Sequence, residues 1–297
     1  MPGKAVQNKY FDKVIKGGND RYGSQLRSTI VLFIHFLAIL MFAGCALTPT
    51  MPPSPQGISP FFPRDRWQLL NAAERVPKAL KALARIDLTT PSGRYPLKVA
   101  ILLQYPEHFR MESIPLFGPP DFYLTIENGE LKVFLPQEGK YYIGSPSQAQ
   151  LASFLPFISS RFQLSDMLAL LRGTVPLIQD QDINLKGFQE SEYYRLEVYR
   201  GEEKAQVFWL KPESNELVRA TLWGKNGDIL YTAQFEAYGG LKEADDFPAK
   251  ISVTMGPPNP ATLSLQYMDI QFLREIQPDL FSLEVPPGIK PLRLKEQ

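Results

Sequence analysis

The spacing of apolar side chains changes partway along the chain. Residues Arg64–Ala84 carry apolar side chains at three- and four-residue spacing, which predicts a helix, and Pro77 predicts a kink or a break within it. Beyond this segment apolar side chains recur at every second position, as in Leu97–Leu103, and Asn128-Gly129 is typical of a tight turn between antiparallel strands. The pattern predicts a meander of about eleven strands.

Residues 147–173 interrupt the alternation after the sixth predicted strand. Two apolar stripes at helical spacing predict two short helices, the second of which ends at Gly173. So many consecutive strands must curl or split, and their apolar face needs a cover. We therefore expect one α+β domain over residues 64–297, a single curved antiparallel sheet forming a half-open barrel, capped by the N-terminal helix and the helical insertion.

The N-terminal region has the order of segments that is typical of a secretory signal peptide. Basic residues predominate in residues 1–29, and an apolar run from Ile30 to Ala43 follows, shorter than the ~20 residues that a membrane span needs. The run leads to Cys45, the only cysteine. This arrangement predicts a lipoprotein signal peptide over residues 1–44. The alternative is a buried cysteine at the end of an uncleaved anchor helix.

Phe42-Ala43-Gly44-Cys45 resembles the bacterial lipobox, although Phe42 stands where Leu is usual. The resemblance implies a diacylglyceryl group on Cys45 and cleavage before it. In lipoproteins of the enterobacterial type, an Asp directly after the lipidated cysteine retains the protein in the inner membrane. This chain has Ala46 there, which favours an outer-membrane destination. Six prolines among residues 46–63 predict an extended, semi-rigid tether, so we assign residues 45–63 to the lipidated cysteine and its tether.

An ordered set of motifs resembles the LolA/LolB class of bacterial lipoprotein carriers. The set comprises an early Trp67, then Leu88–Gly93 with its threonines and glycine, and then Phe109–Gly118, which ends in Pro115-Leu116-Phe117-Gly118. Phe117 is one residue more than the family phrase contains. The resemblance covers most of residues 64–270 as architecture, and none of its motifs is catalytic.

The resemblance implies an apolar cavity that takes acyl chains. Its expected lining is formed by Val99, Ile101, Leu103, Phe109, Met111, Phe122, Leu124, Ile126, Val133, Leu151, Phe154, Leu155, Leu168, Leu196 and Val198. The stripes within 151–171 are either plain core or a mobile lid. The resemblance also implies that Leu116, with Phe117 beside it, projects from a loop and contacts the membrane. The prolines around this pair prevent a strand, so the loop is either exposed for binding or folded back onto the barrel rim.

The amino-acid composition limits the kinds of partner and of catalytic or metal site that we expect. Lys plus Arg number 32 and Asp plus Glu 31, which gives no reason to expect a nucleic-acid partner. One cysteine and two histidines disfavour a metal site, and the chain has no G-x-S-x-G, P-loop or H-E-x-x-H motif. We therefore predict no catalytic residue, no metal and no cofactor.

Six further polar residues have roles that the sequence leaves open. The arginines can contact anionic headgroups, although solvated surface positions are the plainer interpretation, and the two carboxylates flank the Leu116 loop without evidence of an acid–base pair. They are Arg94, Arg110, Arg161, Arg172, Glu112 and Asp121.

The sequence thus favours an outer-membrane-anchored periplasmic lipoprotein without enzymatic activity. Its expected partners are the membrane, through the lipid anchor, the acyl chains of a lipid or lipoprotein, and a periplasmic carrier protein that delivers them. Two alternatives stay open. One is an interaction or stress-sensing module on the same fold, and the other is an enzyme acting on lipid or envelope polymer.

Overall fold

The computed structural model describes most of the chain from Gln56 to Leu294. The described residues are 56–57, 59, 61–71, 77–106, 108–146, 163–178, 182–242, 244–257 and 260–294. They belong to a compact unit, Pro55–Gln297, which is distinct from Met1–Ser54. Residues 56–57 and 61–63, which the sequence assigns to the tether, form β1 and the start of α2. The predicted signal peptide and Cys45 lie outside the described residues.

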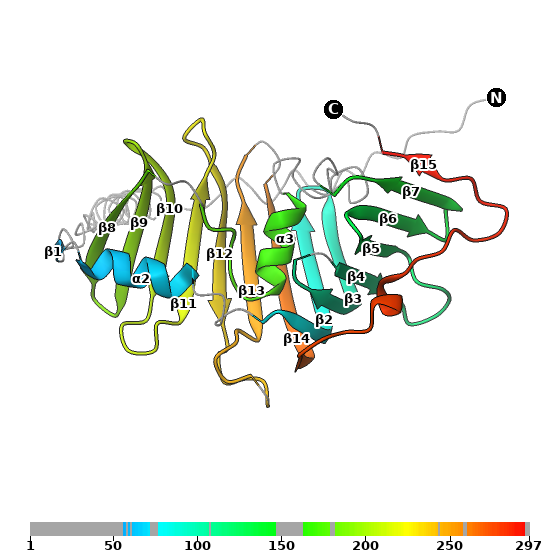
Figure 1. Cartoon of the computed structure of the whole chain (residues 1–297), viewed down its shortest axis with the longest axis horizontal. Helices are drawn as coiled ribbons and strands as arrows, with labels where there is room; N and C mark the ends of the chain where they lie inside the picture. Colours follow the sequence, from blue (N-terminus) through cyan, green and yellow to red (C-terminus); the bar gives the residue numbers. More distant parts are fainter. Residues whose placement is uncertain are drawn as a thin grey trace, which may run out of the picture. The chain divides into compact units, whose positions relative to one another are not determined.

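The described strands form one open sheet (Figure 1), in the order β1-β8-β9-β10-β11-β12-β13-β14-β2-β3-β4-β5-β6-β7-β15. Neighbours are antiparallel except β15, which runs parallel to β7. The bounds are β1 Gln56–Gly57, β2 Ala79–Thr90, β3 Gly93–Gln104, β4 His108–Ser113, β5 Tyr123–Glu127, β6 Glu130–Leu135, β7 Lys140–Gly144, β8 Ile183–Glu190, β9 Tyr193–Arg200, β10 Glu203–Leu210, β11 Leu217–Trp223, β12 Ile229–Glu236, β13 Lys250–Met255, β14 Ala261–Leu273 and β15 Leu292–Arg293. The expected single antiparallel sheet is confirmed, apart from the parallel pairing of β15.

The predicted number of strands, about eleven, is too low, because the described residues alone form fifteen. Two of the missed strands, β1 and β15, are dipeptides at the two edges. Another missed strand is β8, in which the positions on the side of the core include Ile183, Leu185 and Gly187. A glycine in this row removes one apolar side chain from the alternation on which the prediction depends.

The predicted helix Arg64–Ala84 is wrong in its second half. The helix α2 spans Phe61–Asn71, and Ala79–Thr90 is instead strand β2. The apolar residues of this stretch fit both a helical and an alternating period, and Pro77 separates the two elements. Pairing decides the outcome, because β2 is held between β3 and β14.

The helical insertion is confirmed in part. Helix α3 spans Leu164–Leu171, as the second apolar stripe predicts, and the chain turns at Gly173, where φ is +74°. The first stripe, with Leu151, Phe154 and Leu155, lies outside the described residues.

The main core lies on the concave face of the sheet, where side chains from β2–β6 and from β9–β14 are buried. Both α2 and α3 lie against this face (Figure 1). Trp67 of α2 packs against Phe208 of β10, and Asp166 of α3 accepts a hydrogen bond from Tyr231 of β12. The two helices therefore cover different strands of the same apolar surface.

The C-terminal segment covers part of the opposite, convex face. It contains the 3-10 helix η3, Pro278–Phe281, and Phe281 is fully buried against His108, with ring centroids 5.2 Å apart. Arg110 donates hydrogen bonds to the carbonyls of Leu280 and Ser282, at 3.1 and 3.0 Å. We call residues 274–294 the C-terminal strap, and it ends beside β7 as β15.

Candidate ligand-binding face

The predicted cavity lining is brought together on the concave face. The described members belong to one buried cluster, and Leu168 is half-buried and packs against it. Leu151, Phe154 and Leu155 lie outside the described residues. These side chains come from β3, β4, β5, β6, β9, α3 and the segment that precedes β5. The fold therefore brings them together in one continuous apolar surface. Their role as an acyl-chain lining stays a prediction.

Helix α3 is joined to this surface at its N-terminus by a buried carboxylate. Asp166 Oδ1 accepts a hydrogen bond from the hydroxyl of Tyr231, at 3.0 Å, and Asp166 Oδ2 accepts one from the backbone N–H of Gln163, at 2.8 Å. Burial raises the pKa of the Asp166 carboxyl, and these two hydrogen bonds oppose that effect. Burial is also the largest cause of the raised pKa of Tyr231.

The other end of α3 is held by a second phenol. The buried hydroxyl of Tyr267, on β14, donates a hydrogen bond to the carbonyl of Leu171, at 2.6 Å. Gly173 follows directly, and a Cβ there would lie 2.8 Å from the ring of Phe247. Both ends of α3 are therefore fixed by directional contacts with the sheet, in addition to the burial of Leu170 and Leu171.

Helix α2 lies against the sheet by apolar packing. Pro63, Trp67 and Leu70 form its buried stripe at helical spacing. Arg66 donates one hydrogen bond, at 3.2 Å, to the carbonyl of Pro212. Its guanidinium also lies 5.4 Å from the centroid of the Tyr194 ring.

Tyr194 is the exception among the buried phenols beneath the two helices. Its side chain is 2% exposed, and its hydroxyl has no hydrogen-bond partner among the described residues. A Cβ on Gly187 would collide with this hydroxyl and would lie 2.9 Å from Pro63 Cγ. The hydroxyl is therefore enclosed between β8 and the start of α2. Burial raises the pKa of Tyr194 to about 12, and an unsatisfied buried hydroxyl costs roughly 1–3 kcal/mol.

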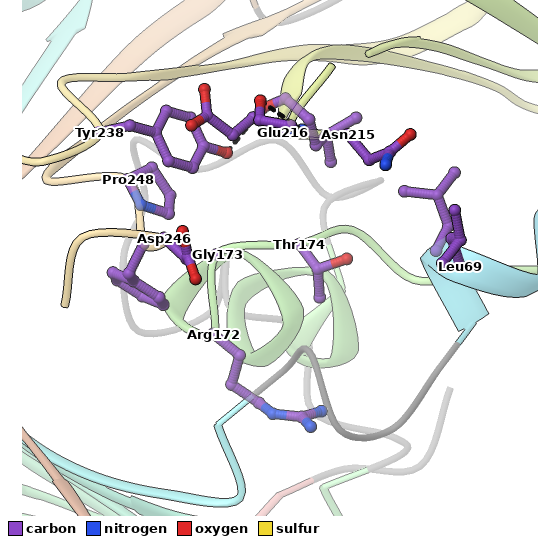
Figure 2. A pocket seen from close by; sticks show the side chains of 13 residues that line it. Leu69, Arg172, Gly173, Thr174, Asn215, Glu216, Tyr238, Asp246 and Pro248 are labelled. Carbon is purple, nitrogen blue, oxygen red and sulfur yellow. Dashed lines mark hydrogen bonds between the residues drawn. The ribbon is translucent and has the colours of Figure 1, made fainter. Parts of the chain in front are cut away.

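A pocket of about 350 Å³ opens between the two helices and the adjoining loops (Figure 2). The lining comes from α2, the end of α3, the β10–β11 turn and the β12–β13 loop: Leu69, Leu70, Arg172, Gly173, Thr174, Ser214, Asn215, Glu216, Leu217, Tyr238, Asp246, Phe247 and Pro248. Three of these, Leu70, Leu217 and Phe247, are members of the main core cluster. The apolar floor of the pocket is thus continuous with the concave face.

The polar groups of the pocket are mostly engaged at its rim. Arg172 is turned away from the opening in Figure 2, donates a hydrogen bond to the Pro77 carbonyl at 3.0 Å, and lies 3.8 Å from the Tyr105 ring centroid. Burial lowers the pKa of this guanidinium. Glu216 pairs with Lys211 at 2.6 Å. An apolar floor beneath a polar rim suits an amphiphile, with its chain inward and its polar end at the rim.

A second feature lies on the loop between β4 and β5. Leu116 is 94% exposed and Phe117 is 93% exposed. The base of the loop is fixed, because the buried hydroxyl oxygen of Ser113 accepts hydrogen bonds from the backbone N–H groups of Asp121 and Phe122, at 2.6 and 3.4 Å. Of the two alternatives that the sequence left open, the exposed loop is the one observed.

The other singled-out polar residues make ordinary contacts. Arg94 pairs with Asp87 on the surface, and Arg110 pairs with Glu112 at 3.2 Å while it binds the C-terminal strap. Asp121 accepts a hydrogen bond from Gln137 at 2.8 Å. Arg161 lies outside the described residues. A solvated surface role therefore describes Arg94 but not Arg110 or Arg172, which are half-buried and bound to backbone carbonyls.

The described residues contain neither a metal-binding cluster nor a helix that could span a membrane. No group of three or more His, Cys, Asp or Glu side chains is placed to hold a metal ion in the described part of the chain. Among the described helices, none has the length and hydrophobicity needed to cross a membrane.

The sequence predicted the loop and the apolar face but missed the pocket and Tyr194, whose hydroxyl has no hydrogen-bond partner within the described part of the chain. The pocket residues come from four segments that are far apart in the chain, so no local period marks them. The one available signal was Gly173, which ends the predicted helix and lines the pocket. Tyr194 occupies a core-facing position of its strand, as the hydrogen-bonded Tyr231 does. The sequence pattern is therefore the same for both, and only the packing around the hydroxyl differs.

Comparisons with known proteins support the fold. No protein-family model matches the chain, and no curated protein matches it in sequence. A LolA superfamily protein from Nitrosomonas europaea, NE2245, is 14% identical with a TM-score of 0.53, over 73% of this chain and 97% of that one. A DUF1329 family protein from Desulfovibrio piger is 13% identical with a TM-score of 0.53, over 76% and 98%. The chain therefore has a LolA-like fold, as its sequence motifs predicted.

Proposed function

We propose that this chain is an envelope lipoprotein that binds the acyl chains of a lipid or of a lipidated protein against the concave face of its sheet. The observation that carries the proposal is the pocket between α2 and α3, which has a polar rim and a floor continuous with the apolar core. Burial of an acyl chain contributes ~0.8 kcal/mol per methylene, so sequestration needs no chemistry. The LolA superfamily neighbour supports the architecture required.

The localisation and delivery steps belong to the same proposal. Cys45 would carry the lipid that anchors the chain at the periplasmic face of the outer membrane, and a periplasmic carrier would hand over the ligand. Leu116 and Phe117 would enter the bilayer interface, since two adjacent large apolar side chains are almost fully exposed on a loop with a fixed base.

Native mass spectrometry tests ligand binding directly. The full chain with Cys45→Ser would be purified from a bacterial envelope fraction, and its bound lipids would be extracted and identified. We expect one acylated molecule per chain. A mass that stays that of the protein alone, also after incubation with monopalmitoyl glycerol, would contradict the proposal.

Membrane contact is tested separately with vesicles of phosphatidylethanolamine and phosphatidylglycerol. Leu116→Glu should weaken vesicle co-sedimentation at least tenfold, because a carboxylate would have to enter the interface. Met268→Glu is the matched control, since Met268 is a half-exposed apolar residue on β14, outside the loop. Equal losses for the two variants would show that the loop has no special contact with the membrane.

A second candidate function is a protein-interaction or stress-sensing module. The concave face contains large, fully buried side chains, among them Phe109, Phe208 and Phe235. A face filled by its own side chains favours this alternative, which the protein-only mass in the experiment above would support.

A further inference from the structure

A groove of about 520 Å³ lies on the convex face of the sheet, where β2 pairs with β14 on one side and with β3 on the other. Its lining alternates along the strands with core residues such as Leu88 and Leu265, so the groove and the apolar core lie on opposite faces. The lining side chains are all polar: Arg85, Asp87, Thr89, Arg94, Thr262, Ser264 and Gln266. A groove without an apolar lining suits a polar ligand and not an acyl chain.

The charges in and beside the groove are not balanced. Arg94 donates hydrogen bonds from Nε to both carboxylate oxygens of Asp87, at 2.7 and 2.9 Å, so these two side chains neutralise each other. Arg85 lies directly opposite Lys98 of β3. Both side chains are exposed, and neither forms an ion pair with a described residue. Like charges directly opposite each other destabilise a sheet, and a bound anion would relieve their repulsion.

Hydroxyl groups continue from the groove across the neighbouring strands. Thr89 lies opposite Thr262, and Thr262 lies opposite Thr254 of β13. Thr254 in turn lies opposite Thr232 of β12. We call these four residues the threonine row, in which hydroxyl groups recur at the ~4.8 Å spacing of the strands. A hydroxyl both donates and accepts hydrogen bonds, which suits the hydroxyl and acetamido groups of a chain of sugar rings.

We propose that the convex groove binds the glycan of the bacterial cell wall, an anionic polymer of N-acetylated amino sugars that carries peptide carboxylates. Arg85 and Lys98 bind a carboxylate, and the threonine row binds the hydroxyl and acetamido groups of successive sugars. The inference rests on the envelope localisation in the proposed function but not on its acyl ligand, which would occupy the other face of the sheet. An anionic membrane fits the groove less well, because no lining side chain is apolar and able to enter the interface.

Co-sedimentation with purified peptidoglycan sacculi tests the groove. The full chain with Cys45→Ser should bind, and the further change Arg85→Glu should weaken binding at least tenfold, because repulsion replaces attraction. Lys81→Glu is the matched control, since Lys81 is exposed on the same face of β2, outside the groove, and undergoes the same change of charge. This control should weaken binding less than twofold. Equal losses for the two variants, or no binding by the parent chain, would overturn the proposal, and neither result bears on acyl-chain binding.

The hydroxyl contact is tested at a single position. Thr262→Val removes the hydroxyl with little change in volume and should weaken binding to sacculi about fivefold, the ordinary effect of one hydrogen bond. Thr262→Ser keeps a hydroxyl and should bind as the parent chain does. Equal binding by these two variants would overturn the role of the threonine row.

Vesicles of phosphatidylethanolamine and phosphatidylglycerol distinguish a glycan from a membrane as the ligand. Arg85→Glu should change co-sedimentation with these vesicles less than twofold while it releases the chain from sacculi. A larger loss on vesicles than on sacculi would identify an anionic membrane as the ligand of the groove and would overturn its assignment to a glycan.

Discussion

Helices α2 and α3 cover the same face of one sheet by different means. Helix α3 buries a carboxylate and a backbone carbonyl, and each accepts a hydrogen bond from a buried phenol of the sheet. The buried side chains described on helix α2 are apolar, its hydrogen bond from Arg66 goes to the Pro212 carbonyl in a turn, and it encloses a phenol whose hydroxyl has no hydrogen-bond partner among the described residues. Burial of apolar side chains is enough to hold a helix against a sheet. Hydrogen bonds have a required direction, so they favour one position of the helix over neighbouring positions.

The largest effect is expected at the end of α3. Gly173→Ala should lower the free energy of unfolding by about 3 kcal/mol, because φ is positive there and the new Cβ would meet the Phe247 ring. Gly227→Ala is the matched control, with a similar φ of +76° and no atom within 4 Å of the added Cβ. Urea denaturation of both variants measures the difference, and equal losses would show that crowding at Gly173 is unimportant.

A smaller effect separates the two helices. Tyr267→Phe leaves the Leu171 carbonyl without its donor and should cost roughly 1–3 kcal/mol. Tyr194→Phe removes a hydroxyl with no partner among the described residues and should leave stability unchanged or raise it. Thermal unfolding of the pair measures this contrast. Comparable destabilisation by both variants would mean that the Tyr194 hydroxyl contributes a hydrogen bond after all.

The smallest effect depends on pH. Because burial raises the pKa of Asp166 in the folded state, that state binds the proton more tightly than the unfolded chain does. The contribution of Asp166 to stability should therefore increase as pH falls from 7 through its raised pKa toward the ordinary value of 3.8.

Asp166→Asn isolates this contribution, since its amide oxygen can still accept from Tyr231 while the titration is lost. The lowered pKa values of Asp87 and Glu197 act in the opposite direction, and their effect is common to both proteins. The stability difference between the two proteins, measured by urea denaturation from pH 4 to pH 7, should move in favour of Asp166 at acidic pH. A difference that is constant across this range would contradict the assignment.

The sequence predicts most of the sheet because a strand buried on one face carries its own period. Asn128-Gly129 indeed forms the turn between β5 and β6, with φ of +52° and +74°. The start of β2 was missed because Ala79–Ala84 fits two periods, and the pairing with β3 and β14 that selects the strand is not local. Long-range pairing is information that a single local pattern does not contain.

The sequence predicted only the part of the candidate site that a local sequence feature marks. Three prolines around Leu116 exclude a strand, and together with the family resemblance they placed an apolar pair on a loop. The partner of each buried phenol depends on which helix covers it. Tyr194, Tyr231 and Tyr267 therefore look alike in the sequence and differ only in the folded chain.

The strand order has a consequence for assembly of the chain. Strands β2–β7 and β8–β14 are two consecutive meanders, each built from neighbours in sequence, and they join where β14 pairs with β2. That junction links residues 79–90 to residues 261–273, so it closes the longest loop and must wait until β14 has been synthesised. A chain divided between the two meanders should yield halves that associate mainly through this ladder, helped by the short pairings of β1 with β8 and of β15 with β7, which makes the protein suited to fragment complementation.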